Sequence, residues 1–174
     1  MSAQTQGGRE AEILDMLKAM SPDELRCLAR KLDRSTMTPS VLSWVSAQRS
    51  LDLGTALTMF IHAEPAEFNH LEKEDVPEAQ RRLCAALDAL CQRINCGYYL
   101  PAGEHPLDDV APVAAWMKAQ DEDDRSRRKG RWRFTPAVVA PMTSDIRRIV
   151  EPRKTAARTE RPGLFRRAFN QQSA

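Results

Sequence analysis

The chain has 174 residues, of which 42% are hydrophobic, and its 26 Lys or Arg nearly balance its 24 Asp or Glu. This length suits one ordinary domain with a tail, and no run approaches the ~20 apolar residues of a membrane-spanning helix. The polar start MSAQTQGGRE is unlike a secretory signal. We therefore expect a cytoplasmic protein without a transmembrane segment.

The first third of the chain predicts three helices. Residues 1–8 have the composition of a disordered start, and a helix follows at about residues 9–20 with its apolar residues on one face. SPDE at 21–24 provides a capping Ser21, a proline at the first helical position and a Glu that completes a capping box. Thr38 and Pro39 begin the third helix by the same device.

The stretch SLDLGTALTMFIHAE, residues 50–64, predicts a buried helix and its N-cap. A carboxylate at the cap accepts hydrogen bonds from the free N–H groups of the first turn. A helix start can also bind an anion, but the charge of the Asp opposes one, so capping is the preferred role. The run that follows is apolar on most sides, which favours a position at the centre of the core. The motif residues are Asp52, Gly54, Thr55, Ala56 and Leu57.

The middle of the chain predicts two more helices. The longest is expected at about residues 76–96, with leucines on one face, and Gly97 ends it. After a loop rich in Pro and Gly, a sixth helix is expected at residues 108–120. The sequence therefore predicts an all-α fold, a compact bundle of about six helices over residues 9–120.

Beyond residue 120 the character of the sequence changes. Residues 1–124 hold 12 Lys or Arg and 21 Asp or Glu, a net charge of −9, whereas residues 125–174 hold 14 and 3, a net charge of +11. We expect an acidic-to-basic linker with a weak helix at residues 121–150, and a basic, partly disordered C-terminal extension at residues 151–174. Such asymmetry suggests an acidic partner, a nucleic acid or a membrane surface; the extension could also fold back on the acidic domain of its own chain.

The residues that could carry chemistry form no recognisable catalytic or metal-binding set. The cysteine spacing, C-x6-C-x4-C after an isolated first cysteine, lacks the close pairs of a zinc site. No histidine lies in a metalloprotease motif or near a nucleophile signature. We therefore predict no enzyme, no metal and no cofactor. The residues considered are His62, His70, His105, Cys27, Cys84, Cys91 and Cys96.

The basic stretch after residue 124 is the best functional signal in the sequence. Cations suit phosphates, and aromatic faces can stack on bases, so this stretch predicts contact with nucleic acid or with an acidic partner. The alternative is a solvated linker that neutralises the acidic domain. The residues are Arg125, Arg127, Arg128, Lys129, Arg131, Trp132, Arg133 and Phe134.

A second candidate binding segment lies near the C-terminus. GLFRRAF at residues 163–169 combines apolar and basic side chains, which suggests docking to a protein groove or weak contact with a membrane surface. Its candidate docking residues are Leu164, Phe165, Arg166, Arg167 and Phe169.

LDLGTALTMF, preceded by SPDELRCLARKLD and VLSWVSAQ, resembles a family of small bacterial helical domains of unknown function that carry an Asp-x-Gly-Thr-Ala-Leu motif. The resemblance covers about residues 14–67. It implies a bacterial source and the importance of the motif residues, and it implies no activity.

Together these features predict a non-enzymatic protein–protein interaction module, such as an adaptor, a regulator or an inhibitor of the immunity type, with an unidentified protein partner. The alternative is a nucleic-acid-associated protein that binds phosphate through residues 125–167. The two differ in how steeply binding falls with added salt.

Overall fold

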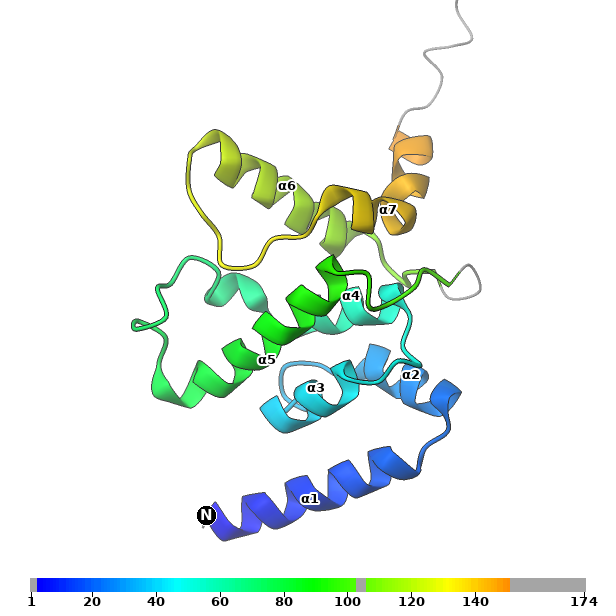
Figure 1. The fold of residues 1–174 in the computed structure, drawn as a ribbon, viewed down its shortest axis with the longest axis vertical. Coiled ribbons are helices and arrows are strands. Elements are labelled where there is room, and N and C mark those ends of the chain that lie inside the picture. Colours follow the sequence, from blue (N-terminus) through cyan, green and yellow to red (C-terminus); the bar gives the residue numbers. More distant parts are fainter. Residues whose placement is uncertain (1–2, 103–105, 151–174) are drawn as a thin grey trace, which may run out of the picture. The chain divides into compact units, whose positions relative to one another are not determined.

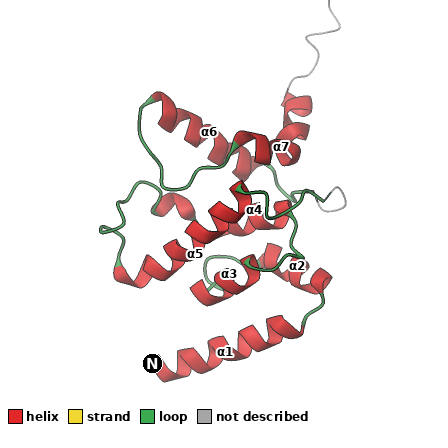
Figure 2. Ribbon diagram, in the orientation of Figure 1, coloured by secondary structure: helices red, strands yellow, loops and turns green. Residues whose placement is uncertain are grey.

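The computed structural model describes residues 3–102 and 106–150, and within these ranges the protein is all-helical without a strand (Figures 1 and 2). The predicted all-α fold is confirmed, with seven α-helices in the described part of the chain. They are α1 (Ala3–Ala19), α2 (Pro22–Lys31), α3 (Pro39–Ser46), α4 (Leu53–His62), α5 (Glu78–Asn95), α6 (Ala111–Arg125) and α7 (Pro136–Val150), with a short 3-10 helix, η1 (Pro65–Glu67), after α4.

The N-terminal helix is longer than expected. α1 begins at Ala3, inside the segment that we predicted to be disordered. Contacts with residues distant in the sequence hold α1 in position, and local composition does not reveal such contacts. The Glu10 carboxylate accepts a hydrogen bond from Thr38 Oγ1 at 2.8 Å, and Leu17 is buried, so α1 is tied to the start of α3.

Three of the helix starts are the ones that the sequence predicts. Ser21 and Glu24 form a full capping box at α2, and Thr38 accepts from the N–H of Val41 at α3. Asp52 caps α4. These caps are local, four-residue arrangements, which is why the sequence alone predicts them.

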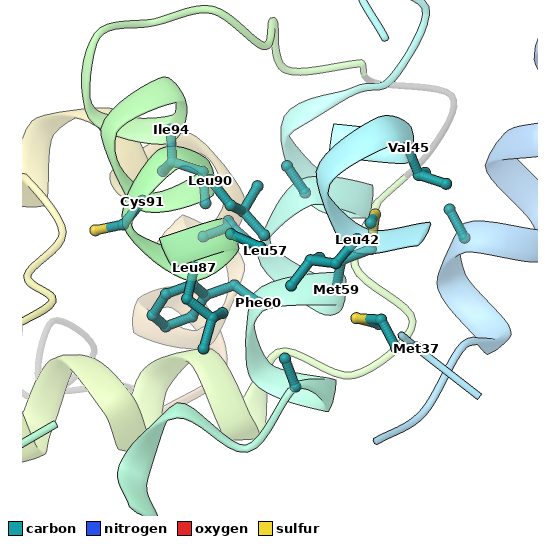
Figure 3. Packing of buried hydrophobic residues seen from close by; sticks show 14 of the residues in the cluster. Met37, Leu42, Val45, Leu57, Met59, Phe60, Leu87, Leu90, Cys91 and Ile94 are labelled. Atoms are coloured by element: carbon teal, nitrogen blue, oxygen red, sulfur yellow. The ribbon is translucent and has the colours of Figure 1, made fainter. Parts of the chain in front are cut away.

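The core is built around α4, as its nearly continuous apolar sequence predicts. α4 packs against α2, α5 and α6, and α3 packs against both α1 and α5. Figure 3 shows Leu42 of α3, Leu57 and Phe60 of α4, and Leu87 and Leu90 of α5 converging on one another. All five are fully buried, so this contact is the centre of the core.

The packed unit does not end at residue 120. Trp132, Phe134 and Val139 belong to the same buried cluster as the helices before them. The chain divides into the units Met1–Ser144 and Asp145–Ala174, so the predicted domain boundary at residue 120 is wrong, and the segment expected to be a linker contributes to the core. Among the described helices, none has the length and apolarity needed to cross a membrane.

Candidate functional site

The Asp-Leu-Gly-Thr motif forms the first turn of α4. Asp52 Oδ1 accepts from the N–H of Thr55 at 2.8 Å, and Asp52 Oδ2 accepts from Thr55 Oγ1 at the same distance. Both residues are buried, as are Gly54, Ala56 and Leu57. The predicted capping role is therefore confirmed for Asp52.

Two arginines of α2 lie against this cap. Arg30 Nε donates to Thr55 Oγ1 at 2.9 Å and Arg30 Nη2 donates to Asp52 Oδ1 at 3.3 Å. Arg30 Nη1 also reaches the carbonyl of Pro106 and the Asp108 carboxylate, at 2.7 and 3.1 Å. The arginine thus joins α2, the start of α4 and the segment before α6 in one polar network.

The second arginine, Arg26, donates to the exposed Asp23 carboxylate and lies near Asp52 without a hydrogen bond to it. Arg26 Nε lies 3.8 Å from Asp52 Oδ2, and this buried nitrogen has no hydrogen-bond partner among the described residues. Asp52 therefore faces two guanidinium groups, which stabilises its buried negative charge. These contacts assign a structural role to the motif, because its polar atoms are directed at one another.

Gly54 allows close packing at the same place. A Cβ atom on Gly54 would lie 3.0 Å from Met142 Cε of α7, 3.1 Å from Asp52 Oδ1 and 3.2 Å from Arg30 Nη2. Each distance is shorter than an ordinary van der Waals contact. A larger residue at position 54 would therefore require these side-chain ends to shift by a few tenths of an ångström, and α7 covers the motif at Met142.

The structure corrects the prediction for the aromatic residues of the basic stretch. The exposed fractions of Trp132 and Phe134 are 2% and 1%, so neither offers a face for stacking on a base. Their rings surround Phe60, at centroid distances of 6.1 and 4.8 Å, and Trp116 joins them at 5.3 Å from Phe60. These aromatic residues are core residues.

Three side-chain amides hold the backbone of residues 131–135 against the helices. Gln120 both donates to and accepts from the backbone of Phe134, at 2.8 Å in each case. Asn95 accepts a hydrogen bond from one backbone N–H of this segment and donates one to a backbone carbonyl, both at 2.7 Å. Asn69 accepts from two consecutive N–H groups through its side chain and its carbonyl. The amides take the place of a neighbouring β-strand and satisfy the buried backbone.

Asp88 of α5 anchors the beginning of this segment. It accepts two hydrogen bonds from the Arg131 guanidinium, at 2.9 and 2.7 Å, and a third from Trp132 Nε1 at 2.8 Å. Burial raises the pKa of the Asp88 carboxyl, but the hydrogen bonds from Arg131 and Trp132 outweigh it and hold that pKa below its usual value. Arg131 is therefore committed to Asp88, and Arg133 pairs with Asp124 in a similar way.

The remaining cations of the basic stretch are exposed and lie at the end of α6. The amides of Arg127 and Arg128 bond back to the carbonyls of Asp124 and Asp123, the pattern of a Schellman motif. Arg127 occupies the left-handed region, with φ of 56°. Arg125, Arg127, Arg128 and Lys129 form no ion pair within residues 3–102 and 106–150.

The predicted C-terminal docking residues, Leu164, Phe165, Arg166, Arg167 and Phe169, lie outside the described residues. Among those that are described, no three His, Cys, Asp or Glu side chains gather as a metal site would require. Burial raises the pKa of the Cys91 thiol to about 11 and also raises that of Cys84. Both cysteines therefore stay protonated, as expected for small buried apolar residues.

A groove between α3 and α5 is a feature that we did not predict from the sequence. It has a volume of about 660 Å³. The α3 wall consists of Pro39, Ser40, Ser43 and Trp44, and the α5 side consists of Arg82, Ala85, Ala86, Ala89 and Arg93. We call this the α3–α5 groove.

The sequence contains a signal for this groove beside the apolar face of α5. Arg82, Ala85, Ala89 and Arg93 follow one another at intervals of three or four residues, so they share a helix face. That face is offset from the leucines that enter the core, and it carries alanine where a solvated helix usually carries charge. Which element lies beside the alanines depends on long-range packing, which the pattern does not reveal.

The fold and these contacts define an all-helical domain with a buried capping network, an anchored aromatic segment and an open groove. No protein-family model, curated protein or solved structure matches the chain.

Proposed function

We propose that the protein is a non-enzymatic protein–protein interaction module and that the α3–α5 groove is its binding surface. The groove is the observation that carries this proposal. It presents a tryptophan and two arginines around a floor of alanines, and Trp and Arg are among the residue types that contribute most to binding at protein interfaces.

The other polar clusters support the same proposal because their groups are engaged within the chain. Asp52, Thr55 and Arg30 bond to one another, and Asp88 accepts hydrogen bonds from Arg131 and Trp132. Covalent catalysis needs a nucleophile with a base at hydrogen-bond distance. Among the described residues, the cysteines and His62 bond to backbone carbonyls and to one asparagine, and His70 lies 3.4 Å from the Asp123 carboxylate. None of these contacts joins a nucleophile to a base.

Binding to nucleic acid is the second candidate function. Four exposed cations at the end of α6 favour it: Arg125, Arg127, Arg128 and Lys129. The burial of Trp132 and Phe134 weighs against it, because it removes the two aromatic rings that single-stranded binding would use. Phosphate contacts alone would then carry the affinity.

A capture experiment with matched tryptophan variants tests the proposal. Ala85 of the groove and Ala115 of α6 are both exposed helical alanines, so Ala85→Trp and Ala115→Trp change helix propensity equally. We expect the wild-type chain and Ala115→Trp to retain one defined protein from a lysate of the source organism after nuclease treatment, and Ala85→Trp to lose it. Retention that nuclease abolishes, or that Ala85→Trp leaves intact, contradicts the proposal.

A further inference from the structure

We infer that the occupant of the α3–α5 groove is an amphipathic helix of a partner protein that carries one carboxylate near each end of its apolar face. This inference rests on the proposed function and adds the chemistry of the partner. The shape of the groove, its charges and the charges of the competing occupants support it.

The floor of the groove permits close approach of a helix. The α5 residues that line the groove between Arg82 and Arg93 are all alanines. Alanine side chains allow two helix axes to approach to the short end of the usual 8–10 Å range. The two arginines are 11 positions apart, which corresponds to about 16 Å of helix, or three turns.

The α3 wall supplies an apolar contact for such a helix. Trp44 is half-buried and lines the groove together with Pro39. A tryptophan ring with one free face provides a large apolar contact area with little loss of side-chain freedom on binding. Ser40 and Ser43 place hydroxyl groups on the same wall.

The positive charges at the two ends of the groove favour a partner that is negatively charged at the matching positions. None of the side chains that line the groove is a carboxylate. Arg93 donates to Ser46 Oγ at 2.9 Å and also interacts with the buried Tyr99 hydroxyl, but a guanidinium has five N–H groups. Arg82 is exposed. The hydrogen bonds from Thr38 and Ser40 lower the pKa of the Glu10 carboxyl of α1, and the charge of Arg82 adds a smaller contribution in the same direction.

An apolar middle between two cations is complementary to an apolar helix with an anion at each end. Carboxylates are favoured over other acceptors because the guanidinium fork can bind both of their oxygens. A partner whose Asp or Glu residues lie 10 to 12 positions apart would reach both arginines. Binding would follow the helix-in-groove mode, in which apolar residues at intervals of three and four contact the floor.

Two other occupants are less complementary. The chain's own segment at residues 163–169 carries Arg166 and Arg167 and no acid, so it would bring positive charge to a positive groove. A second copy of the chain could supply acids from the end of α6, where Asp121, Glu122 and Asp124 are exposed. That stretch has no apolar residue between its acids.

Selection from a peptide library tests the inference on the full-length protein. The probe is a displayed library of 20-residue helices with a fixed Ala/Leu face and random residues elsewhere, selected on the wild-type chain and counter-selected on Ala85→Trp. We expect the surviving peptides to be enriched in Asp or Glu at positions 10 to 12 apart. A synthetic survivor is then titrated against variants by fluorescence anisotropy.

Charge reversal gives the sharpest readout. Arg82→Glu should weaken the selected peptide at least tenfold, which corresponds to about 1.4 kcal/mol. Arg128→Glu, an exposed arginine away from the groove, should leave the affinity within twofold. Replacing the corresponding Glu of the peptide with Arg should restore binding to Arg82→Glu and not to the wild-type chain.

The outcomes separate the inference from the proposed function. Survivors that depend on Ala85 but show no preference for acids overturn the inference and leave the interaction module standing. A library that gives no survivor sensitive to Ala85→Trp overturns both. If the double variant Phe165→Ala/Phe169→Ala binds the peptide more tightly, the occupant of the groove is the chain's own terminal segment. If the wild-type chain is a dimer by sedimentation and Ala85→Trp is a monomer, the occupant is a second copy of the chain. Either result overturns the inference.

Discussion

Two carboxylates, Asp52 and Asp88, each join distant parts of the chain through arginine, and they do so in different surroundings. The Asp52 side chain is 5% exposed and faces Arg26 and Arg30 at the start of α4. The Asp88 side chain is 40% exposed and faces Arg131 on the side of α5. Both accept three hydrogen bonds through their two oxygens, so exposure is the main difference between them.

This difference in exposure determines what each carboxylate contributes. A buried charge interacts strongly with its partners, and removing it leaves the partner charges uncompensated in a medium of low polarity. An exposed charge is screened by water and salt, and its partner can be solvated when it is lost. We therefore expect the Asp52 network to hold the fold together and the Asp88 network to hold one segment in place.

The largest predicted effect is the loss of the buried carboxylate. Asp52→Ala removes the cap of α4 and the buried carboxylate between the two arginines, which then keep only the exposed carboxylates Asp23 (for Arg26) and Asp108 (for Arg30). We therefore expect the free energy of unfolding to fall by about 2–4 kcal/mol. Urea unfolding followed by circular dichroism measures it. Asp52→Asn is the control, because it retains the cap and should be the less destabilised variant. A loss below about 1 kcal/mol for Asp52→Ala would mean that burial does not distinguish the two sites.

At the second carboxylate we predict a smaller and more local effect. Asp88→Asn removes the paired hydrogen bonds with Arg131 while one acceptor for Trp132 remains, so we expect a loss of about 1–2 kcal/mol. Amide exchange at residues 131–135 should accelerate more than exchange in α4, as NMR would show. Asp124→Asn, at the exposed partner of Arg133, is the matched control and should change stability by less than about 0.5 kcal/mol. Uniform acceleration across the protein would contradict a local role.

The two carboxylates also show what could and could not be predicted from the sequence. The cap at Asp52 is encoded within four residues, and so are the caps at Ser21 and Thr38 and the left-handed Gly97 that follows α5. These helix ends were therefore predictable from local sequence. The arginines over Asp52 come from α2, more than 20 residues away, and no local pattern assigns them.

The same limit accounts for the error at the basic stretch. Its composition suggested an exposed nucleic-acid surface, but Trp132 and Phe134 are held by residues 14 to 63 positions away in the sequence. A signal was present in the alternation of Arg131, Trp132, Arg133 and Phe134, because alternate side chains of an extended segment point to opposite sides. The aromatic rings are buried, whereas Arg131 and Arg133 are only partly buried and pair with carboxylates. The groove could not be predicted from the sequence either, because it depends on α3 lying beside α5, and that placement follows only from the packing of the whole domain.

A third prediction concerns the close contact above Asp52. Gly54→Ala should lower the free energy of unfolding by about 1 kcal/mol, because the overpacking against Met142, Asp52 and Arg30 exceeds the gain in helix propensity. The double variant Gly54→Ala/Met142→Ala separates the two contributions by making room for the new methyl group. The sum of the two single-variant effects predicts a certain free energy of unfolding for the double variant. We expect the measured value to be higher than this sum and closer to that of Met142→Ala. Strict additivity would show that Met142 does not press on Gly54.

The smallest predicted effect is the pH dependence of the exposed site. The pKa of Asp88 in the folded protein lies below its ordinary value because the hydrogen bonds from Arg131 and Trp132 outweigh burial. Its contribution to stability is therefore complete above the unfolded-state pKa of about 3.9 and is lost as the pH falls through the lower folded-state pKa. The difference in unfolding free energy between the wild-type chain and Asp88→Asn should shrink as the pH is lowered from 6 to 3, by less than about 1 kcal/mol because the carboxylate is 40% exposed. Since screening acts on exposed pairs, 1 M salt should also reduce this difference at pH 6. A difference that stays constant with both pH and salt would mean that the hydrogen-bond geometry of Asp88, and not its charge, holds the segment at residues 131–135.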